Sequence, residues 1–214
     1  MVYCSADNVN VSDEGVSMAS GKNAEKHSWQ QGLMLYIHDL IYMLLAVMLL
    51  FLIVFRVIVV TQDSMFSTLW DGDYLLLVSS LFCGEPRQGD IVVISKKAFD
   101  DGRPIVKRVI ATEGQIVDID FETGTVSVDG SVLEEPYING NTTDAEGTEF
   151  PLIVEKGCIF VLGDNRGVSL DSRSPQIGQI DRREVLGKAV FLMIPGTHHG
   201  QFLPDYSRIG AIRQ

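Results

Sequence analysis

Residues 40–60 of this 214-residue chain read LIYMLLAVMLLFLIVFRVIVV, and Arg56 is the only charged residue in the stretch. An α-helix rises 1.5 Å per residue, so about 20 apolar residues cross the hydrocarbon core of a bilayer. The stretch therefore predicts a transmembrane helix over residues 40–60. Residues 33–39, LMLYIHD, are expected to form an interfacial lead-in to it.

Two alternatives to a membrane anchor deserve a test. A cleaved secretory signal would have an apolar region of roughly 7 to 15 residues followed by a small-x-small cleavage site, whereas Thr61, Gln62 and Asp63 follow here. A buried helix of a soluble protein seldom lacks polar residues on every face. Both alternatives are disfavoured by the pattern.

The charge balance limits the partners of the protein. The 17 Lys and Arg residues against 28 Asp and Glu give a formal net charge of -11, which opposes capture of nucleic-acid phosphates. We therefore expect no nucleic-acid partner. Lys22 and Lys26 precede the apolar stretch, which favours a cytoplasmic N-terminus by the positive-inside rule. Most of the acidic excess follows Arg56 and belongs to the domain beyond the membrane.

The texture of the sequence divides the chain into four parts. Residues 1–32 are expected to be a flexible cytoplasmic tail, 33–60 the lead-in and helix, 61–195 a β domain and 196–214 a C-terminal tail. Short β-branched runs at 90–94, 105–110, 116–119, 158–162 and 190–194 predict strands. Asp129-Gly130 predicts a type I′ hairpin between 125–128 and 131–133, and residues 138–150 predict a surface loop. The fold class expected is mainly β, following one N-terminal transmembrane helix.

Cysteine and histidine usage gives no metal site. Cys4, Cys83 and Cys158 are too few for a disulfide framework and have no C-x-x-C spacing. A disulfide between Cys83 and Cys158 stays open, although two free buried thiols are favoured. His198 and His199 have no further ligand at metal-binding spacing. We expect no metal and no organic cofactor.

Two polar positions stand out in apolar surroundings. Ser64 lies four residues beyond the predicted span, a distance of at most about 13 Å, so it would sit near the membrane surface; the alternative is a hydroxyl that caps a turn. Lys107 lies in the predicted strand 105–110, where alternation sends it and Arg108 to opposite faces. A buried lysine loses its proton readily. The alternative is a solvated lysine on an edge strand.

A third polar segment, GDNRGVSLDSRS at residues 163–174, follows the apolar run 159–162. Its two carboxylates and two guanidinium groups can form forked, charge-assisted pairs that hold a loop rigidly. The segment therefore predicts the preorganised wall of a site, with a solvated loop as the alternative.

Together the three segments resemble the motifs of the bacterial type I signal peptidases. That family has a Ser-Met-x-Pro-Thr-Leu box after a membrane anchor, a Lys-Arg box ending in Gly, and a Gly-Asp-Asn-Arg-x-x-Ser-x-Asp-Ser-Arg box. Here these are residues 64–69, 107–114 and 163–173. Residues 89–92 and 187–189 also resemble family segments, and the resemblance covers residues 40–195.

The resemblance implies a role for each matched residue. Ser64 would be the nucleophile, and Lys107 the general base that activates it without a histidine. Ser169 would orient the lysine amine. Asp171 and Arg173 would be structural partners of the site, and Asp164 and Arg166 would hold the same loop in place. The walls of shallow pockets for small side chains of the substrate would be formed by Val60, Met65, Leu69 and Val106.

Two positions depart from the family pattern. Ser67 replaces the motif proline, so the loop loses a rigid turn. Gln62 stands where relatives carry a hydroxyl or a glycine. The Ser64 backbone N–H is expected to donate to the oxyanion, with the Gln62 side-chain amide as second donor.

The sequence thus predicts a serine endopeptidase with a Ser–Lys dyad. It would act as a monomer at the outer face of the cytoplasmic membrane, where it would cleave signal peptides from exported preproteins, with the lipid bilayer and those signal peptides as its partners. One alternative is a catalytically silent, membrane-anchored module that binds signal peptides. A self-cleaving regulator like the SOS repressors, which share a Ser–Lys β domain, is disfavoured by the net charge and by the apolar span.

Overall fold

The computed structural model describes residues 17–97, 99–197 and 203–212. The chain separates into two compact units, residues 1–51 and residues 52–214, which are treated one at a time below. The first holds most of one helix and the second holds all of the strands.

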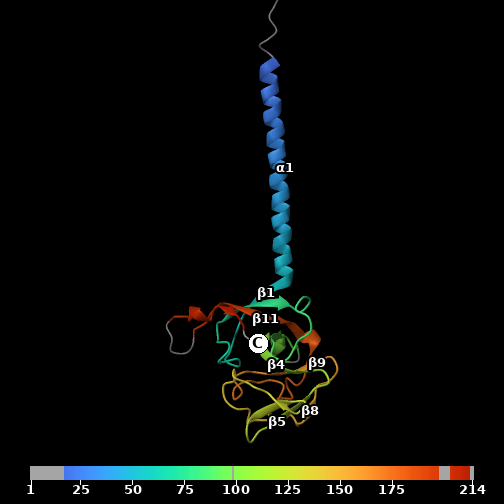
Figure 1. Ribbon diagram of the computed structural model, residues 1–214, viewed down its shortest axis with the longest axis vertical. Helices are drawn as coiled ribbons and strands as arrows, with labels where there is room; N and C mark the ends of the chain where they lie inside the picture. Colours follow the sequence, from blue (N-terminus) through green and yellow to red (C-terminus); the bar gives the residue numbers. More distant parts are fainter. Residues whose placement is uncertain (1–16, 98, 198–202, 213–214) are drawn as a thin grey trace, which may run out of the picture. The chain divides into compact units, whose positions relative to one another are not determined.

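Helix α1 extends over Ser17–Val54 (Figure 1). Within it, Gly32–Val54 is long and apolar enough to cross a membrane, and none of its most apolar window is buried. A core helix of a soluble protein would instead bury one face against other elements. The exposed apolar side chains on this span are those expected of a helix surrounded by lipid.

The predicted ends of the span need correction. The helix ends at Val54, not at residue 60, and it already begins at Ser17, within the stretch assigned to a flexible tail. Phe55–Val59 instead forms strand β1, which pairs antiparallel with β2 (Tyr74–Ser79). The run 54–60 is rich in β-branched residues, which favour a strand wherever a partner strand is available. Arg56 therefore lies in a strand, and Ser64 follows the end of the helix by ten residues and not four.

The larger sheet is antiparallel and has the order β1-β2-β11-β3-β4-β9-β10, with β12 added to β11. Its other strands are β3 (Ile91–Ile94), β4 (Ile105–Thr112), β9 (Cys158–Leu162), β10 (Ile180–Asp181), β11 (Val185–Ile194) and β12 (Gly210–Ala211). Three short 3-10 helices lie between strands: η1 (Asp100–Gly102), η2 (Arg182–Glu184) and η3 (Tyr206–Arg208).

The smaller sheet has the order β7-β6-β5-β8 and lies at the opposite end of the domain from β1 and β11 (Figure 1). Its strands are β5 (Ile116–Asp120), β6 (Thr125–Val128), β7 (Ser131–Val132) and β8 (Leu152–Ile153). Asp129 and Gly130 connect β6 to β7 with φ angles of 52° and 78°, as the predicted type I′ turn requires. The mainly β fold and its N-terminal apolar helix are confirmed.

The C-terminal residues also differ from the expectation of a tail. Residues 203–212 form η3 and β12, and Ile212 packs against the apolar cluster beneath Ser64. That cluster includes Met65, Leu69, Leu75 and Val106. Two further clusters fill the space around β9 and the smaller sheet.

Cys83 and Cys158 are separate, half-buried thiols. Cys4 and the pair His198-His199 lie outside the described residues. Among the residues that are described, no group of three or more His, Cys, Asp or Glu side chains is arranged to hold a metal ion.

Candidate active site

Ser64 lies in a loop that is closed at its base, the Ser64 loop (residues 60–73). The backbone N–H of Val60 donates to the carbonyl of Asp73 (2.8 Å), and Gly72 donates back to Val60 (2.9 Å). Inside the loop, Leu69 donates to the Met65 carbonyl (2.8 Å), and both of these side chains are buried in the core. The apolar residues therefore anchor the loop while Ser64 stays partly accessible.

Ser64 and Lys107 line the same groove, whose volume is about 590 Å³. Lys107 comes from the centre of β4 and is only 3% exposed. The groove's other walls come from Thr61, Gln62, Asp63, Phe99, Arg103, Pro104, Ile105, Val106, Val168 and Leu170. A partly accessible hydroxyl and a buried amine thus line one accessible space.

Burial sets the protonation of Lys107. Loss of hydration lowers the pKa of its amine from 10.5 to about 8, while the negative charge of Asp171 acts in the opposite direction and the positive charge of Arg173 lowers the pKa further. At neutral pH a useful fraction of Lys107 is therefore neutral and able to accept a proton.

Arg108 points to the other face of β4, as strand alternation predicts, and it is buried too. Its Nε and Nη2 donate to the two carboxylate oxygens of Asp164 at 2.8 and 2.7 Å. Asp164 also accepts from the hydroxyl of Thr68, in the Ser64 loop. The guanidinium lies 3.8 Å from the centre of the Tyr137 ring. This buried pair fastens β4, the Ser64 loop and the segment after β9 to one another.

The residues on either side of Asp164 hold Ser64 from below. The Asn165 backbone N–H donates to the Ser64 carbonyl (3.0 Å), and its side-chain amide donates to the Asp63 carbonyl (2.9 Å). Gly163 packs so closely that an added Cβ would lie 2.5 Å from the Ser64 carbonyl oxygen and 2.1 Å from the Ser169 hydroxyl oxygen. Only glycine fits at this position.

Ser169 and Asp171 are both fully buried. The Ser169 hydroxyl has no hydrogen-bond partner among the described residues. Asp171 accepts from the Gly163 backbone N–H (3.0 Å) and from Nε of Arg173 (2.8 Å). Arg173 also pairs with Glu146 (3.1 Å). One buried hydrogen-bond network therefore joins Arg173 to Asp171 and to the carbonyls of Arg166 (2.8 Å) and Ser169 (3.1 Å).

Sequence reasoning missed two carboxylates of this network, Glu135 and Glu146. Arg166 donates through both terminal nitrogens to Glu135 and through Nε to the Gly163 carbonyl (3.0 Å). Asp164 and Asp171 are already paired with Arg108 and Arg173, so Arg166 needs a carboxylate from outside its own segment. Residues 163–174 hold two carboxylates and two guanidinium groups, so charge counting within the segment gave no signal that Arg166 pairs with Glu135.

The predicted pocket walls and oxyanion donors are only partly in the groove. Val106 lines it, whereas Val60, Met65 and Leu69 are buried in the cluster below. Gln62 lines the groove with φ at 78°, and its backbone N–H is engaged by Asp71 (2.9 Å). Its side-chain amide is the group left for a ligand.

Comparisons with known proteins cover the part of the chain that contains these site residues. A family model described as signal peptidase, peptidase S26, matches residues 33–194. A signal peptidase I of Bacillus licheniformis is 34% identical over 163 residues, which cover 71% of this chain and 85% of that protein. Signal peptidase I T of Bacillus subtilis strain 168 is 34% identical over 162 residues, covering 71% of this chain and 81% of that one.

Similarity extends to a solved structure. The crystal structure of a signal peptidase I from Enterococcus faecalis V583 aligns with 49% of this chain and 96% of its own, at 30% identity and a TM-score of 0.41.

The close packing of other atoms around Gly163 predicts that two glycine-to-alanine substitutions in the same loop will differ strongly in their effect on stability. Gly163→Ala should lower the free energy of unfolding by about 1–3 kcal/mol, because the new methyl group collides with buried backbone. Gly167→Ala is the matched control, since nothing lies within 4 Å of its added Cβ. Urea unfolding of the purified full-length variants measures both. Equal stabilities would contradict the packing described here.

Proposed function

The chain belongs to the signal peptidase family, peptidase S26, and on that premise we propose that it is a serine endopeptidase that cleaves signal peptides from exported preproteins, with Ser64 as nucleophile and Lys107 as general base. The observation that carries the assignment of the dyad is the shared groove, which is lined both by Ser64 and by Lys107, whose pKa is lowered by burial to about 8. Among the described residues, none of those that line this groove is a histidine.

The proposed reaction has two halves. Ser64 Oγ attacks the carbonyl carbon of the scissile bond while its proton moves to Lys107 Nζ. When the C–N bond breaks, Nζ returns the proton to the departing amine and an acyl-enzyme remains on Ser64. Water then attacks the carbonyl carbon of the ester and gives a proton to Lys107 Nζ. As the bond between that carbon and Ser64 Oγ breaks, Nζ returns the proton to Oγ, and the signal peptide leaves as a carboxylic acid that ionises in water.

The negative charge that develops on the oxygen of the tetrahedral intermediate must be stabilised by hydrogen-bond donors. The backbone N–H of Ser64 donates to no acceptor among the described residues, which supports its assignment as the first donor. The Gln62 side-chain amide is our candidate for the second. Removal of one such donor typically lowers the rate by about 10²- to 10³-fold.

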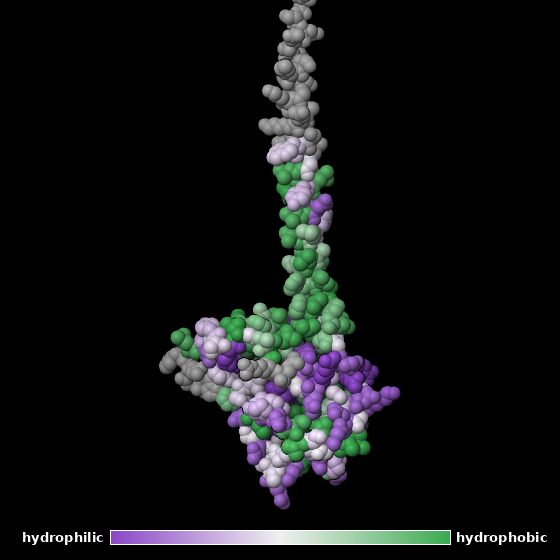
Figure 2. Space-filling view, in the orientation of Figure 1, coloured by the Kyte–Doolittle hydropathy of each residue, from purple (hydrophilic) through white to green (hydrophobic). Residues whose placement is uncertain are grey.

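An apolar face supports action at a membrane. Across β1, β2 and β11, Val59, Tyr74 and Ile194 are in register and are 44%, 41% and 51% exposed. Cross-strand partners share one face of a sheet. Val57 and Phe191 form a second exposed row, in register with Leu76. Figure 2 shows hydrophobic residues gathered over this end of the domain.

A water-exposed apolar patch of this kind is typical of a surface that meets lipid or protein. We propose that it rests on the bilayer and that the domain lies on the outer side, with the N-terminus in the cytoplasm. A signal peptide still inserted in the membrane would then reach the groove directly.

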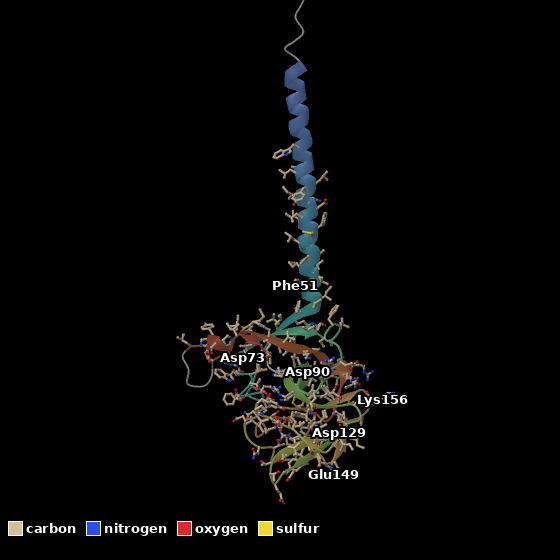
Figure 3. The ribbon with its side chains drawn as sticks, in the orientation of Figure 1. Phe51, Asp73, Asp90, Asp129, Glu149 and Lys156 are labelled. Atoms are coloured by element: carbon tan, nitrogen blue, oxygen red, sulfur yellow. The ribbon has the colours of Figure 1, made fainter. Side chains whose placement is uncertain are left out.

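The proposed dyad predicts loss of turnover in two variants that keep their fold. Ser64→Ala and Lys107→Met should each abolish cleavage of a signal-bearing preprotein, followed by mass spectrometry of the new N-terminus. Lys107→Arg should be equally inactive, because arginine stays protonated. Lys156→Met, at an exposed position labelled in Figure 3, is the control expected to cleave normally.

Near-normal turnover by either dyad variant would refute these roles. A wild-type protein that binds the preprotein without cutting it would instead support the silent binding module.

The pKa of Lys107 predicts the pH dependence. The base must be neutral, so kcat/KM should rise about tenfold per pH unit below the pKa and level off above it. With a pKa of about 8, the half-maximal rate is expected near pH 8. Initial rates of preprotein cleavage between pH 5 and 10 measure the profile, with unfolding midpoints recorded at each pH. A rate that falls from pH 6 to 8 would exclude a lysine base.

The apolar face predicts a defect confined to membranes. Val57→Ser combined with Ile194→Ser should slow cleavage of a preprotein in proteoliposomes several-fold, because less apolar area enters the lipid. Hydrolysis of a short soluble peptide should be unchanged. The matched control replaces Val132 and Ile153, exposed on the smaller sheet, by Ser. Equal rates for both pairs in proteoliposomes would contradict a lipid-facing role.

A further inference from the structure

The C-terminal residues 203–212, here called the C-terminal clasp, contact the Ser64 loop although they lie beyond the family match, which ends at residue 194. Asp205 caps the start of their 3-10 helix η3, and its side chain accepts from the Ser207 backbone N–H (3.0 Å). The clasp is held to the domain by the pairing of β12 with β11 and by Ile212, whose N–H donates to the Val190 carbonyl (3.0 Å). These contacts place Arg208 against the loop.

Arg208 forms a forked ion pair with Asp73, the last residue of the Ser64 loop. Its Nη1 and Nη2 donate to the two oxygens of Asp73 at 3.0 and 2.7 Å. Asp73, labelled in Figure 3 beside β11, is fully buried. The Arg208 guanidinium also lies 3.8 Å from the centre of the Trp70 ring. Planar, forked recognition of this kind suits arginine and not lysine.

Asp73 in turn organises the loop around it. Its carboxylate accepts from the backbone N–H of Trp70 (2.8 Å) and of Gly196 (2.7 Å), while its carbonyl accepts from Val60 at the start of the loop. A buried carboxylate is tolerated only when a cation and hydrogen bonds compensate it. Arg208 is the cation paired with it, so closure of the loop depends on the clasp.

Thr68 is held from two sides. Its hydroxyl donates to Asp164, in the segment after β9, and its carbonyl accepts from Nη2 of Arg208 (3.2 Å). The turn that carries Ser64 ends here, four residues after the nucleophile. Because Ser67 does not restrict the backbone as a proline would, contacts from outside the loop must fix its path.

We infer that Arg208 is a positioning residue for Ser64, which it holds in reacting geometry through Asp73 and Thr68. This inference rests on the proposed function of Ser64 as the nucleophile. It assigns a role in the site to a segment outside the matched family region. Arg208 is not among the described residues that line the groove of Ser64 and Lys107, so we infer that it acts by geometry and not by changing the charge around Lys107.

The test compares Arg208→Gln, Arg208→Lys and the control Arg183→Gln, an exposed arginine paired only with nearby Asp181. A displacement near 1 Å can cost about 10²-fold in rate, so we expect kcat of Arg208→Gln to fall at least about tenfold with KM within about twofold. The pH midpoint should not move. Arg208→Lys keeps the positive charge but cannot form the forked pair, so its kcat should lie between those of wild type and Arg208→Gln. The kcat of Arg183→Gln should match that of wild type.

Hydrogen exchange gives a readout that does not need activity. In full-length Arg208→Gln, well below its unfolding temperature, amides of residues 60–73 should exchange faster, while those of β4 and β9 keep their protection. Asp73→Asn combined with Arg208→Gln should recover part of the lost rate, because the unpaired buried charge is gone. Failure of wild type to cleave any preprotein would refute the proposed function, whereas the exchange pattern still reports on Arg208.

Three results would overturn the inference. They are unchanged exchange in residues 60–73, unchanged kcat in Arg208→Gln, or a loss of rate that only follows a general loss of protection in every strand. If Arg208→Gln does not fold, Arg208→Lys carries the same comparison.

Discussion

The buried carboxylate of Asp164 is the constraint on which the site depends. It receives two hydrogen bonds from Arg108 and one from Thr68, so it joins β4, the Ser64 loop and the segment after β9 at one point. A buried ion pair contributes little net stability compared with apolar packing, yet loss of one partner leaves an uncompensated charge and is strongly unfavourable. Its value here is geometric: the strand that carries Lys107 cannot shift relative to the loop that carries Ser64 without exposing that charge.

The buried arginines differ from the buried Lys107 in having carboxylate partners. Arg108, Arg166 and Arg173 are all buried, and each has at least one carboxylate partner. Arginine keeps its proton in any such environment. Lys107 is buried as deeply, and among the described residues it forms no ion pair within contact distance. The fold thus gives each of these arginines a carboxylate partner, whereas Lys107, which we propose exchanges its proton, has no ion-pair partner among the described residues.

Much of the fold and of the candidate site could be predicted where the sequence signal is local. The run 158–162 matches β9 because an apolar, β-branched stretch between two glycines has few other conformations. Lys107 and Arg108 on opposite faces follow from alternation alone. The end of α1 was wrong because hydropathy does not distinguish an apolar strand from an apolar helix, and only pairing with β2 decided it. Glu135, Glu146 and Arg208 were missed because each partner lies 27 or more residues away in the chain, and charge counting cannot assign such pairs.

The segment after β9 alternates between buried and exposed side chains. Ser169 and Asp171 point into the buried network, whereas Val168 and Leu170 between and beside them are exposed and line the groove. Exchange of the outward side chains alters the shape offered to a peptide without disturbing a single buried hydrogen bond. If the proposed function is correct, substitutions at Val168 and Leu170 would change which cleavage sites are accepted while the buried network stays intact, so selectivity could be altered at these two positions at little risk to folding.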